Sequence, residues 1–328
     1  MRSSQSWLDA TVLATRDLTP TVRELSLQPA GPVVAHAPGS HLQLQIGVNG
    51  KLHTRSYSLV GPPEPQAYRI AVKRLDAGRG GSLAMWRLVA GDRLRITEPQ
   101  NHFPLDLNAP AYLLVAGGIG ITPLLHMAQM LARHKVLKPQ ALRLVYAARG
   151  DEELAYSQEL RDALGERVHT VVSQRGQRID FEHEIAALRP GAQMLVCGPV
   201  TMLDAARRAW TAAGRPMADL RYETFGSSGR FAPQSFRVLV PRHQLDILVP
   251  ADCSLLDALD AAGVQTISDC KRGECGLCAM DVLEVKGEID HRDVFLSDTE
   301  KQQDMRICTC VSRVVGEITL DSSYRPDT

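Results

Sequence analysis

Five of the seven cysteines are crowded near the C-terminus, where they suit a metal centre better than a disulfide framework. Cys270, Cys275 and Cys278 form the pattern C-x4-C-x2-C, and Cys308 and Cys310 follow later in the chain. This is the spacing of plant-type [2Fe–2S] centres, in which a loop supplies three thiolates and a distant cysteine supplies the fourth. Glycines inside the loop would let backbone N–H groups approach the sulfurs and tune the potential.

A zinc site is the alternative for these cysteines. Zinc ribbons commonly use two C-x2-C pairs, whereas the second pair here is Cys308-x-Cys310, so an iron–sulfur cluster is favoured. Either cysteine of that pair could be the fourth ligand. The segment Cys310-Val311-Ser312-Arg313 resembles the fourth-cysteine segment of plant-type ferredoxins. On that resemblance we expect Cys310 to be the ligand and Cys308 to be a free thiol nearby.

A second candidate site is the glycine turn Gly117-Gly118-Ile119-Gly120-Ile121-Thr122-Pro123, which follows an apolar run. The glycines would let the backbone approach a pyrophosphate, and we expect Thr122 at the N-cap and Pro123 at the first helical position. The start of a helix attracts phosphate. The turn departs from the usual dinucleotide fingerprint, because Pro123 replaces the third glycine and Arg149 stands where an acidic residue would close the next strand. A plain tight turn therefore stays open.

A third candidate site joins two segments of the first hundred residues. Arg55-Ser56-Tyr57-Ser58 offers an arginine for a phosphate or a flavin ring and a tyrosine that can stack on an isoalloxazine. Gly78-Arg79-Gly80-Gly81-Ser82 offers an arginine and a hydroxyl that can complete an anion nest. Either segment alone would suggest an exposed arginine beside a turn, but the combination indicates a flavin.

The elements that must position these residues fall into three domains. Residues 1–107 show alternating segments, such as 21–27 and 41–46, between Pro- and Gly-containing turns, which predicts an antiparallel β-barrel. Residues 108–226 alternate apolar runs (112–116, 142–146, 194–197) with helical patterns (123–133, 152–164), which predicts an α/β domain with a parallel sheet.

The third domain follows a linker at residues 227–235, which is rich in Gly, Ser and Pro. It covers residues 236–328. Phe236–Val240 and Leu245–Val249 read as a hairpin, and Ser254 can cap a helix that reaches about Ala262. His291, beside Arg292 and Asp293, is expected at the surface.

Composition and charge limit the partners. The 37 Lys and Arg residues balance the 37 Asp and Glu residues, so no net field indicates nucleic acid. The N-terminus lacks a signal-peptide pattern, and free clustered cysteines suit a reducing compartment, so we expect a cytoplasmic protein. Residues 107–132 are uncharged but are broken by the glycine turn, which favours a buried strand and helix over a membrane span. We expect a monomer that binds neither nucleic acid nor membranes.

Taken together in this order, the motifs resemble the phthalate dioxygenase reductase family, which includes the reductase subunits of vanillate O-demethylase and similar Rieske-type oxygenases. The resemblance covers almost the whole chain in the order flavin barrel, nicotinamide domain, ferredoxin domain, and it implies an α+β (β-grasp) fold for the last. It is carried by the cysteine loop and by Arg55-x-Tyr57-Ser58, Gly80-Gly81-Ser82, Gly117-Gly118-x-Gly120-x-Thr122-Pro123 and Cys197-Gly198-Pro199.

The resemblance also implies cofactors and the residues that bind them: FMN, NADH and a [2Fe–2S] cluster. Residues for the flavin rings and ribityl chain are Arg55, Ser56, Tyr57 and Ser58, and those for its phosphate are Arg79, Gly80, Gly81 and Ser82. Residues for the NAD pyrophosphate are Gly118, Gly120, Thr122 and Pro123. Cys197-Gly198-Pro199 would lie where the nicotinamide meets the flavin, and Phe225 would lie against the flavin. Candidate catalytic residues are Ser58, Cys197 and Phe225, and candidate cluster ligands are Cys270, Cys275, Cys278 and Cys310.

The implied function is electron transfer from a nicotinamide to a terminal Rieske-type oxygenase. A nicotinamide gives two electrons as hydride and the cluster takes one, so a flavin must stand between them. Arg149 could pair with the 2′-phosphate of NADPH, although the resemblance favours NADH. A reductase of the same build that serves another acceptor stays open. A ferredoxin-like carrier or sensor is disfavoured, because the flavin and nicotinamide motifs are intact.

Overall fold

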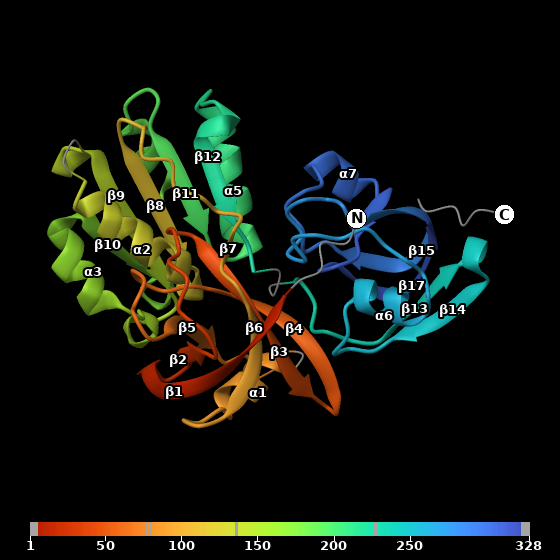
Figure 1. Ribbon diagram of the computed structural model, residues 1–328. Coiled ribbons are helices and arrows are strands. Elements are labelled where there is room, and N and C mark those ends of the chain that lie inside the picture. The colour runs from red at the N-terminus through yellow and green to blue at the C-terminus, as the bar shows by residue number, and fades with distance from the viewer. Residues whose placement is uncertain (1–5, 77, 79, 135–136, 226–228, 323–328) are drawn as a thin grey trace. The chain divides into compact units, whose positions relative to one another are not determined.

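The computed structural model describes residues 6–76, 78, 80–134, 137–225 and 229–322 of the 328-residue chain. The chain forms two compact units (Figure 1). The first holds Met1–Asp76 and Gly80–Glu223, and the second holds Thr224–Thr328. Arg79, Gly226 and the first two residues of the predicted linker, Ser227 and Ser228, lie outside the described residues. No helix in the described ranges is long and apolar enough to cross a membrane.

The first unit begins with an antiparallel sheet in the order β4-β3-β6-β1-β2-β5, with β7 paired to β3. Alternating side chains such as Leu25, Leu27, Leu42 and Leu44 are fully buried between the strands, as the period of two predicts. The elements are β1 (Trp7–Thr19), β2 (Val22–Pro29), β3 (Ser40–Val48), β4 (Lys51–Ser58), β5 (Tyr68–Lys73), α1 (Gly81–Trp86), β6 (Arg93–Thr97) and β7 (Gln100–Asn101).

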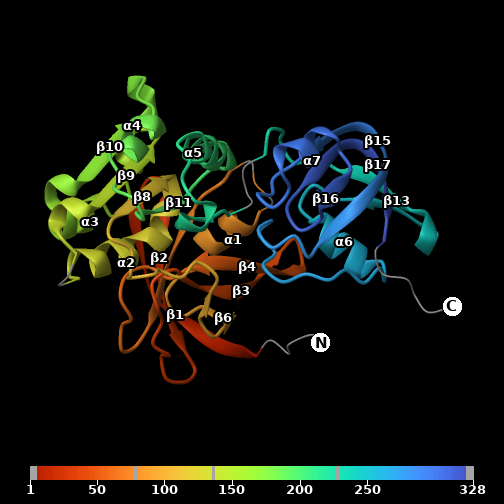
Figure 2. The same ribbon diagram turned by 90° about the horizontal axis from the view of Figure 1, so that it is seen from above.

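The same unit continues with a parallel sheet in the order β10-β9-β8-β11-β12. Its central strand β8 is buried at every residue, which explains the uninterrupted apolar run. Helices α2 and α3 cover one face and α4 and α5 the other (Figure 2). The elements are β8 (Tyr112–Gly117), α2 (Ile121–Ala132), β9 (Leu142–Ala148), α3 (Ser157–Leu164), β10 (Val168–Val172), α4 (Phe181–Ala186), β11 (Gln193–Cys197), α5 (Val200–Ala212) and β12 (Leu220–Glu223).

The predicted strands and the parallel sheet are confirmed, but the helix expected over 152–164 is shorter. Asp151–Glu153 forms a 3-10 turn, and α3 begins only at Ser157. Tyr156, at the N-cap of α3, has a left-handed backbone with φ of 58°, so the chain changes direction there. Its hydroxyl donates to the buried Glu24 of β2 at 2.8 Å, which ties the two sheets of this unit together.

The second unit contains a sheet in the order β14-β13-β17-β15-β16. The predicted hairpin of β13 and β14 is confirmed, and β13 also pairs in parallel with β17. Ser254 caps α6 as predicted, because its hydroxyl accepts from the Asp257 N–H at 3.0 Å. The elements are β13 (Phe236–Val240), β14 (Leu245–Val249), α6 (Leu255–Ala261), β15 (Ala279–Asp290), α7 (Asp298–Gln302), β16 (Arg306–Cys308) and β17 (Arg313–Asp321).

Candidate functional site

Two turns of the parallel sheet meet at its carboxyl edge. Strands β8 and β11 are neighbours, with Ala116 opposite Cys197, so the glycine turn and Cys197-Gly198-Pro199 leave the sheet side by side. The chain runs from β8 to β9 on one side and returns to β11 on the other. In open parallel sheets this reversal of strand order is where ligands bind.

The two turns are packed so closely that side chains are excluded. A Cβ on Gly120 would overlap the carbonyl oxygen of Cys197, and one on Gly117 would lie 2.7 Å from Cδ of Pro199. A Cβ on Gly198 would lie 3.1 Å from Cα of Gly117. The glycines are therefore required for the contact between the turns, whether or not a ligand is bound.

The cap predicted for α2 is wrong. The helix begins at Ile121, with Gly120 at the N-cap, after a 3-10 turn over Gly118–Gly120. Thr122 is inside the helix, where its hydroxyl donates to the carbonyl oxygen of Ile119 at 2.9 Å. Pro123 occupies the third helical position rather than the first, where its missing N–H still costs no intrahelical bond. The 3-10 turn extends the helical path towards the strand and shifts the cap.

The flavin candidates come together from distant parts of the first unit. A Cβ on Gly81 would lie 3.1 Å from Nε of Arg55, so the guanidinium lies directly against the first turn of α1. Ser58 is buried at the end of β4, and its hydroxyl donates to Oε2 of Glu223 at 3.3 Å. Burial raises the pKa of Tyr57 to about 12, so its phenol stays neutral. The role of Glu223 in holding Ser58 has no signal in the sequence.

Four other flavin candidates are placed differently. The hydroxyl of Ser82 accepts from the N–H of Leu75 at 3.0 Å, so it closes the loop before α1. Gly80 has a φ of 80° and forms the N-cap of α1, which a residue with a side chain would adopt only with strain. Ser56 is half-buried on β4. Phe225 is half-buried and belongs to the second unit.

The four predicted cluster ligands lie in the second unit as two pairs. Sγ of Cys270 accepts from the N–H groups of Arg272, Glu274 and Cys275 at 3.4 Å each. Sγ of Cys278 lies 3.2 Å from Sγ of Cys310. A [2Fe–2S] cluster needs four thiolates, two for each iron, and N–H groups that point at a sulfur suit a thiolate. These residues therefore fit such a cluster.

Comparison with known proteins identifies the family. Residues 114–208 match the oxidoreductase NAD-binding domain, and residues 241–315 match the 2Fe-2S iron-sulfur cluster binding domain. The chain is 33% identical over 91% of its length to phthalate dioxygenase reductase of Burkholderia cepacia, of which it covers 91%. A solved structure of phthalate dioxygenase reductase matches 97% of this chain and 98% of that chain, with a TM-score of 0.78 and 32% identity.

The chain belongs to the phthalate dioxygenase reductase family. Another relative is the heme-dependent oxidative N-demethylase beta subunit of Ectopseudomonas mendocina, with 39% identity over 96% of this chain and 98% of that protein. The resemblance read from the motifs is thus confirmed, and the reductase carries an NAD-binding domain and a 2Fe–2S domain in the expected order.

One charged residue at the glycine turn of the reductase was missed. Nζ of Lys73, at the end of β5, lies 4.0 Å from the place a Cβ would take on Gly118. The same ammonium bonds to Oε2 of Glu153 at 2.7 Å, and Glu153 also accepts from the hydroxyl of Thr21 at 2.9 Å. A lone lysine at a strand end carries no motif, so only the fold places this charge beside the turn.

Cys308 is fully buried next to the second pair of cysteines. Hydrogen bonds from the thiols of Cys308 and Cys310 lower the pKa of Cys278 to about 3. The bond to Cys278, followed by burial, raises the pKa of Cys308. Cys278 is therefore the member of this group that is most readily a thiolate, which is the form that binds iron.

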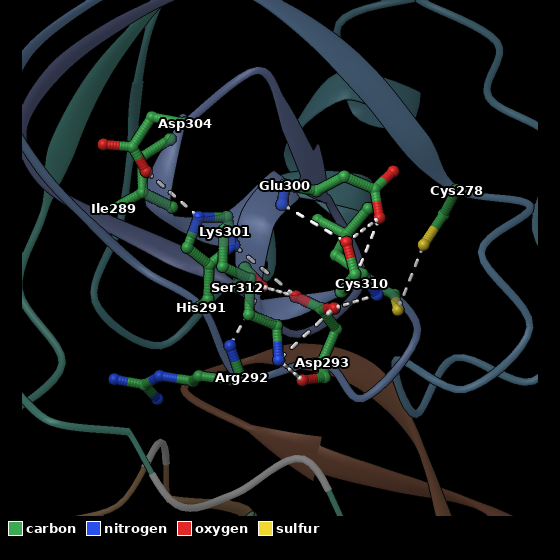
Figure 3. A network of polar contacts seen from close by, with 12 residues as sticks. Cys278, Ile289, His291, Arg292, Asp293, Glu300, Lys301, Asp304, Cys310 and Ser312 are labelled. Carbon is green, nitrogen blue, oxygen red and sulfur yellow. Dashed lines mark hydrogen bonds and ion pairs between the residues drawn. The ribbon is translucent and has the colours of Figure 1, made fainter. Parts of the chain in front are cut away.

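The expectation that His291 lies at the surface is wrong. The side chain of His291 is 8% exposed, and its neighbours Arg292 and Asp293 are buried (Figure 3). Arg292 pairs with Asp290 at 2.6 Å, and Nε2 of His291 lies 3.1 Å from Oδ1 of Asp304. Ion pairing explains how a charged run can be internal, because each charge has a partner.

Proposed function

We propose that this reductase carries electrons from NADH, by way of FMN and a [2Fe–2S] cluster, to a separate Rieske-type terminal oxygenase. The observation that carries the proposal is the grouping of the candidate ligands: the Cys275 N–H donates to Sγ of Cys270, and Sγ of Cys278 lies 3.2 Å from Sγ of Cys310. The same chain has the glycine-packed turns of a nicotinamide domain. Cys270 with Cys275 would hold one iron, and Cys278 with Cys310 would hold the other.

The residues of the first unit would bind and orient the two organic cofactors. A bound flavin accepts hydride and releases single electrons, which joins a two-electron donor to a one-electron acceptor. Ser58 and Cys197 are the residues of this unit that we propose to touch the reacting rings. The bond from Ser58 to the buried carboxylate of Glu223 fixes the direction of its hydroxyl hydrogen, which leaves the oxygen free to accept a hydrogen bond.

The remaining site residues would hold phosphates. The guanidinium of Arg55 lies against Gly81. We propose that this cation and the N–H groups of Gly80, Gly81 and Ser82 face one flavin phosphate. Arg79 is adjacent to these residues in the sequence and would add a second cation. Ser56 and Tyr57 would line the rings and ribityl chain. Gly118, Gly120, Thr122 and Pro123 would line the NAD pyrophosphate, together with Gly198 and Pro199 from the facing turn.

The proposed domains follow the three sheets. Residues 1–107 would form a closed β-barrel for the flavin, residues 108–226 the nicotinamide domain, residues 227–235 a linker, and residues 236–328 a β-grasp ferredoxin domain. The strands of the three sheets begin and end inside these ranges. We place the protein in the cytoplasm as a monomer that binds neither nucleic acid nor membranes, because free buried thiols and balanced charge suit that setting.

A haem protein is the second candidate for the acceptor. The relative with 39% identity is the β subunit of a heme-dependent oxidative N-demethylase by name. A cluster that releases one electron at a time can serve either a Rieske centre or a haem, and the substrate is bound by the acceptor. The reductase residues described above are compatible with both.

Three measurements test the proposal. The denatured protein should release stoichiometric FMN on chromatography, and NADH added without oxygen should produce the EPR signal of a reduced [2Fe–2S] cluster. NADH oxidation should then be stimulated by a purified Rieske oxygenase more than by a haem-dependent demethylase subunit at equal concentration. A flavin-free protein without iron and acid-labile sulfide contradicts the proposal. Preference for the haem subunit leaves the electron path intact and replaces the acceptor.

A further inference from the structure

The carboxylate of Asp293 is fully buried in the second unit and takes no part in binding the cluster in the proposal above. Its oxygens accept from the N–H of Leu296 at 2.9 Å and from the hydroxyl of Ser312 at 3.2 Å. Nδ1 of His291 lies 3.6 Å from Oδ1, and Nζ of Lys301 lies 4.0 Å from Oδ2. The Leu296 N–H and the Ser312 hydroxyl donate to the carboxylate and the Lys301 ammonium is a cation, so these three groups favour the ionised carboxylate (Figure 3).

Asp293 lies between the two segments that carry the cysteines. A Cβ on Gly273, inside the cysteine loop, would lie 2.9 Å from Cα of Asp293, and the N–H of Val294 donates to the carbonyl oxygen of Gly273 at 2.9 Å. On the other side, Ser312 comes two residues after Cys310 in the chain. The negative charge is therefore held next to both ends of the ligand set.

The charge of Asp293 lies beside both segments that would hold the cluster, because its backbone packs against Gly273 and its carboxylate accepts from Ser312. A cluster held by four thiolates gains a further negative charge when it is reduced. A buried anion nearby makes this gain less favourable, because charges interact strongly where water is excluded. The ammonium of Lys301, which also donates to the backbone oxygen of Asp293 at 2.6 Å, offsets part of the effect.

We propose that Asp293 is a positioning residue that lowers the reduction potential of the cluster, and that Lys301 limits this effect. The inference rests on the proposed [2Fe–2S] cluster. A low potential favours release of the electron to the acceptor, whereas a higher potential favours transfer from the flavin. The opposing effects of Asp293 and Lys301 would thus set the driving force for electron transfer from the flavin to the cluster and from the cluster to the acceptor.

The test uses full-length protein with its cofactors and an EPR-monitored redox titration at one pH. Asp293→Asn keeps the size of the side chain and an oxygen that can accept one hydrogen bond, but removes the charge. We expect the equilibrium constant for cluster reduction to rise about tenfold, which is about 59 mV for one electron. Lys301→Met keeps the length of the side chain and should shift the constant in the opposite direction.

Asp304→Asn is the matched control. Asp304 also contacts His291, but its side chain is 35% exposed and it lies on the far side of the ring from Asp293, so the potential should stay near that of the wild type. Opposite shifts for Asp293→Asn and Lys301→Met, with full iron content, support an electrostatic role. If Asp293→Asn does not assemble a cluster, the potential of Lys301→Met tests the inference, and a potential below that of the wild type supports it. Lys301 lies on the short surface helix α7, so its substitution should leave the fold intact.

Several results would overturn the inference. A full cluster with an unchanged potential in Lys301→Met or Asp293→Asn would do so, as would shifts of both variants in the same direction, which indicate a change of packing. A wild-type protein without iron and sulfide contradicts the proposed function itself. These outcomes are distinguishable, because iron content is measured before the titration.

Discussion

Around Gly120 the backbone of one turn rests on the backbone of another, with no space for a side chain. Around Asp293 the opposite arrangement holds, because buried charges and hydrogen bonds connect the cysteine loop to the segment that carries Cys310. A nicotinamide must enter and leave the site that we propose at these turns, so that site needs above all a fixed shape. A cluster stays bound and changes its charge, so its surroundings must also set an electrostatic potential.

The largest effect is expected from removing a cluster ligand in the second unit, near the buried charges around Asp293. Cys310→Ser should abolish the [2Fe–2S] EPR signal, because the pair with Cys278 loses a thiolate, whereas Cys308→Ser should leave the signal nearly intact. Cys310→Ser should still reduce ferricyanide with NADH but fail with cytochrome c. If Cys308→Ser removes the signal and Cys310→Ser does not, the fourth ligand is Cys308.

A smaller effect is expected at the flavin phosphate site, where the guanidinium of Arg55 lies against Gly81. Arg55→Ala should weaken FMN binding by about 1.5–3 kcal/mol, because a charge-assisted phosphate contact is lost. Flavin fluorescence on dilution measures the loss, and Arg93→Ala, an exposed arginine on β6, serves as the control. Equal flavin retention in both variants would exclude Arg55 from the phosphate site.

At the two glycine turns, NADH binding should be weakened by a substitution that adds side-chain volume. Gly120→Ala forces a Cβ onto the carbonyl of Cys197 and should cost about 1–3 kcal/mol, seen as a higher KM for NADH with ferricyanide as acceptor. Gly47→Ala adds the same methyl on β3 where nothing lies within 4 Å and should leave the KM unchanged. An unchanged KM in Gly120→Ala would show that the contact between the turns is dispensable.

The smallest effect concerns an exposed arginine at the end of β9. We expect NADH to be preferred moderately over NADPH by kcat/KM. Arg149→Ala should reduce kcat/KM for NADPH alone, within the roughly 0.2–1 kcal/mol of an exposed ion pair. Arg161→Ala, on α3, is the control. A loss for both nicotinamides would place Arg149 near a group that they share, such as the pyrophosphate.

Local patterns predicted much of this architecture. The run at 112–116 forms the buried strand β8, and the alternating segment at 41–46 lies within β3, where His41 and Gln43 are buried as well as the leucines. Ser254 caps α6 because an N-cap depends only on residues a few positions away. The prediction that Thr122 caps α2 is wrong, since a 3-10 turn can add residues before a helix without a clear sequence signal.

By itself the sequence determined the cysteine spacing, the glycine turns, the order of the three sheets and the family, since each depends on residue type at short separation. Only the tertiary structure brought Arg55 to Gly81, Ser58 to Glu223 and Lys73 to Gly118. It also placed the charged residues next to Asp293 in the interior of the second unit. Such contacts join residues far apart in the chain, and a buried charge is stable only when the whole fold supplies its partners.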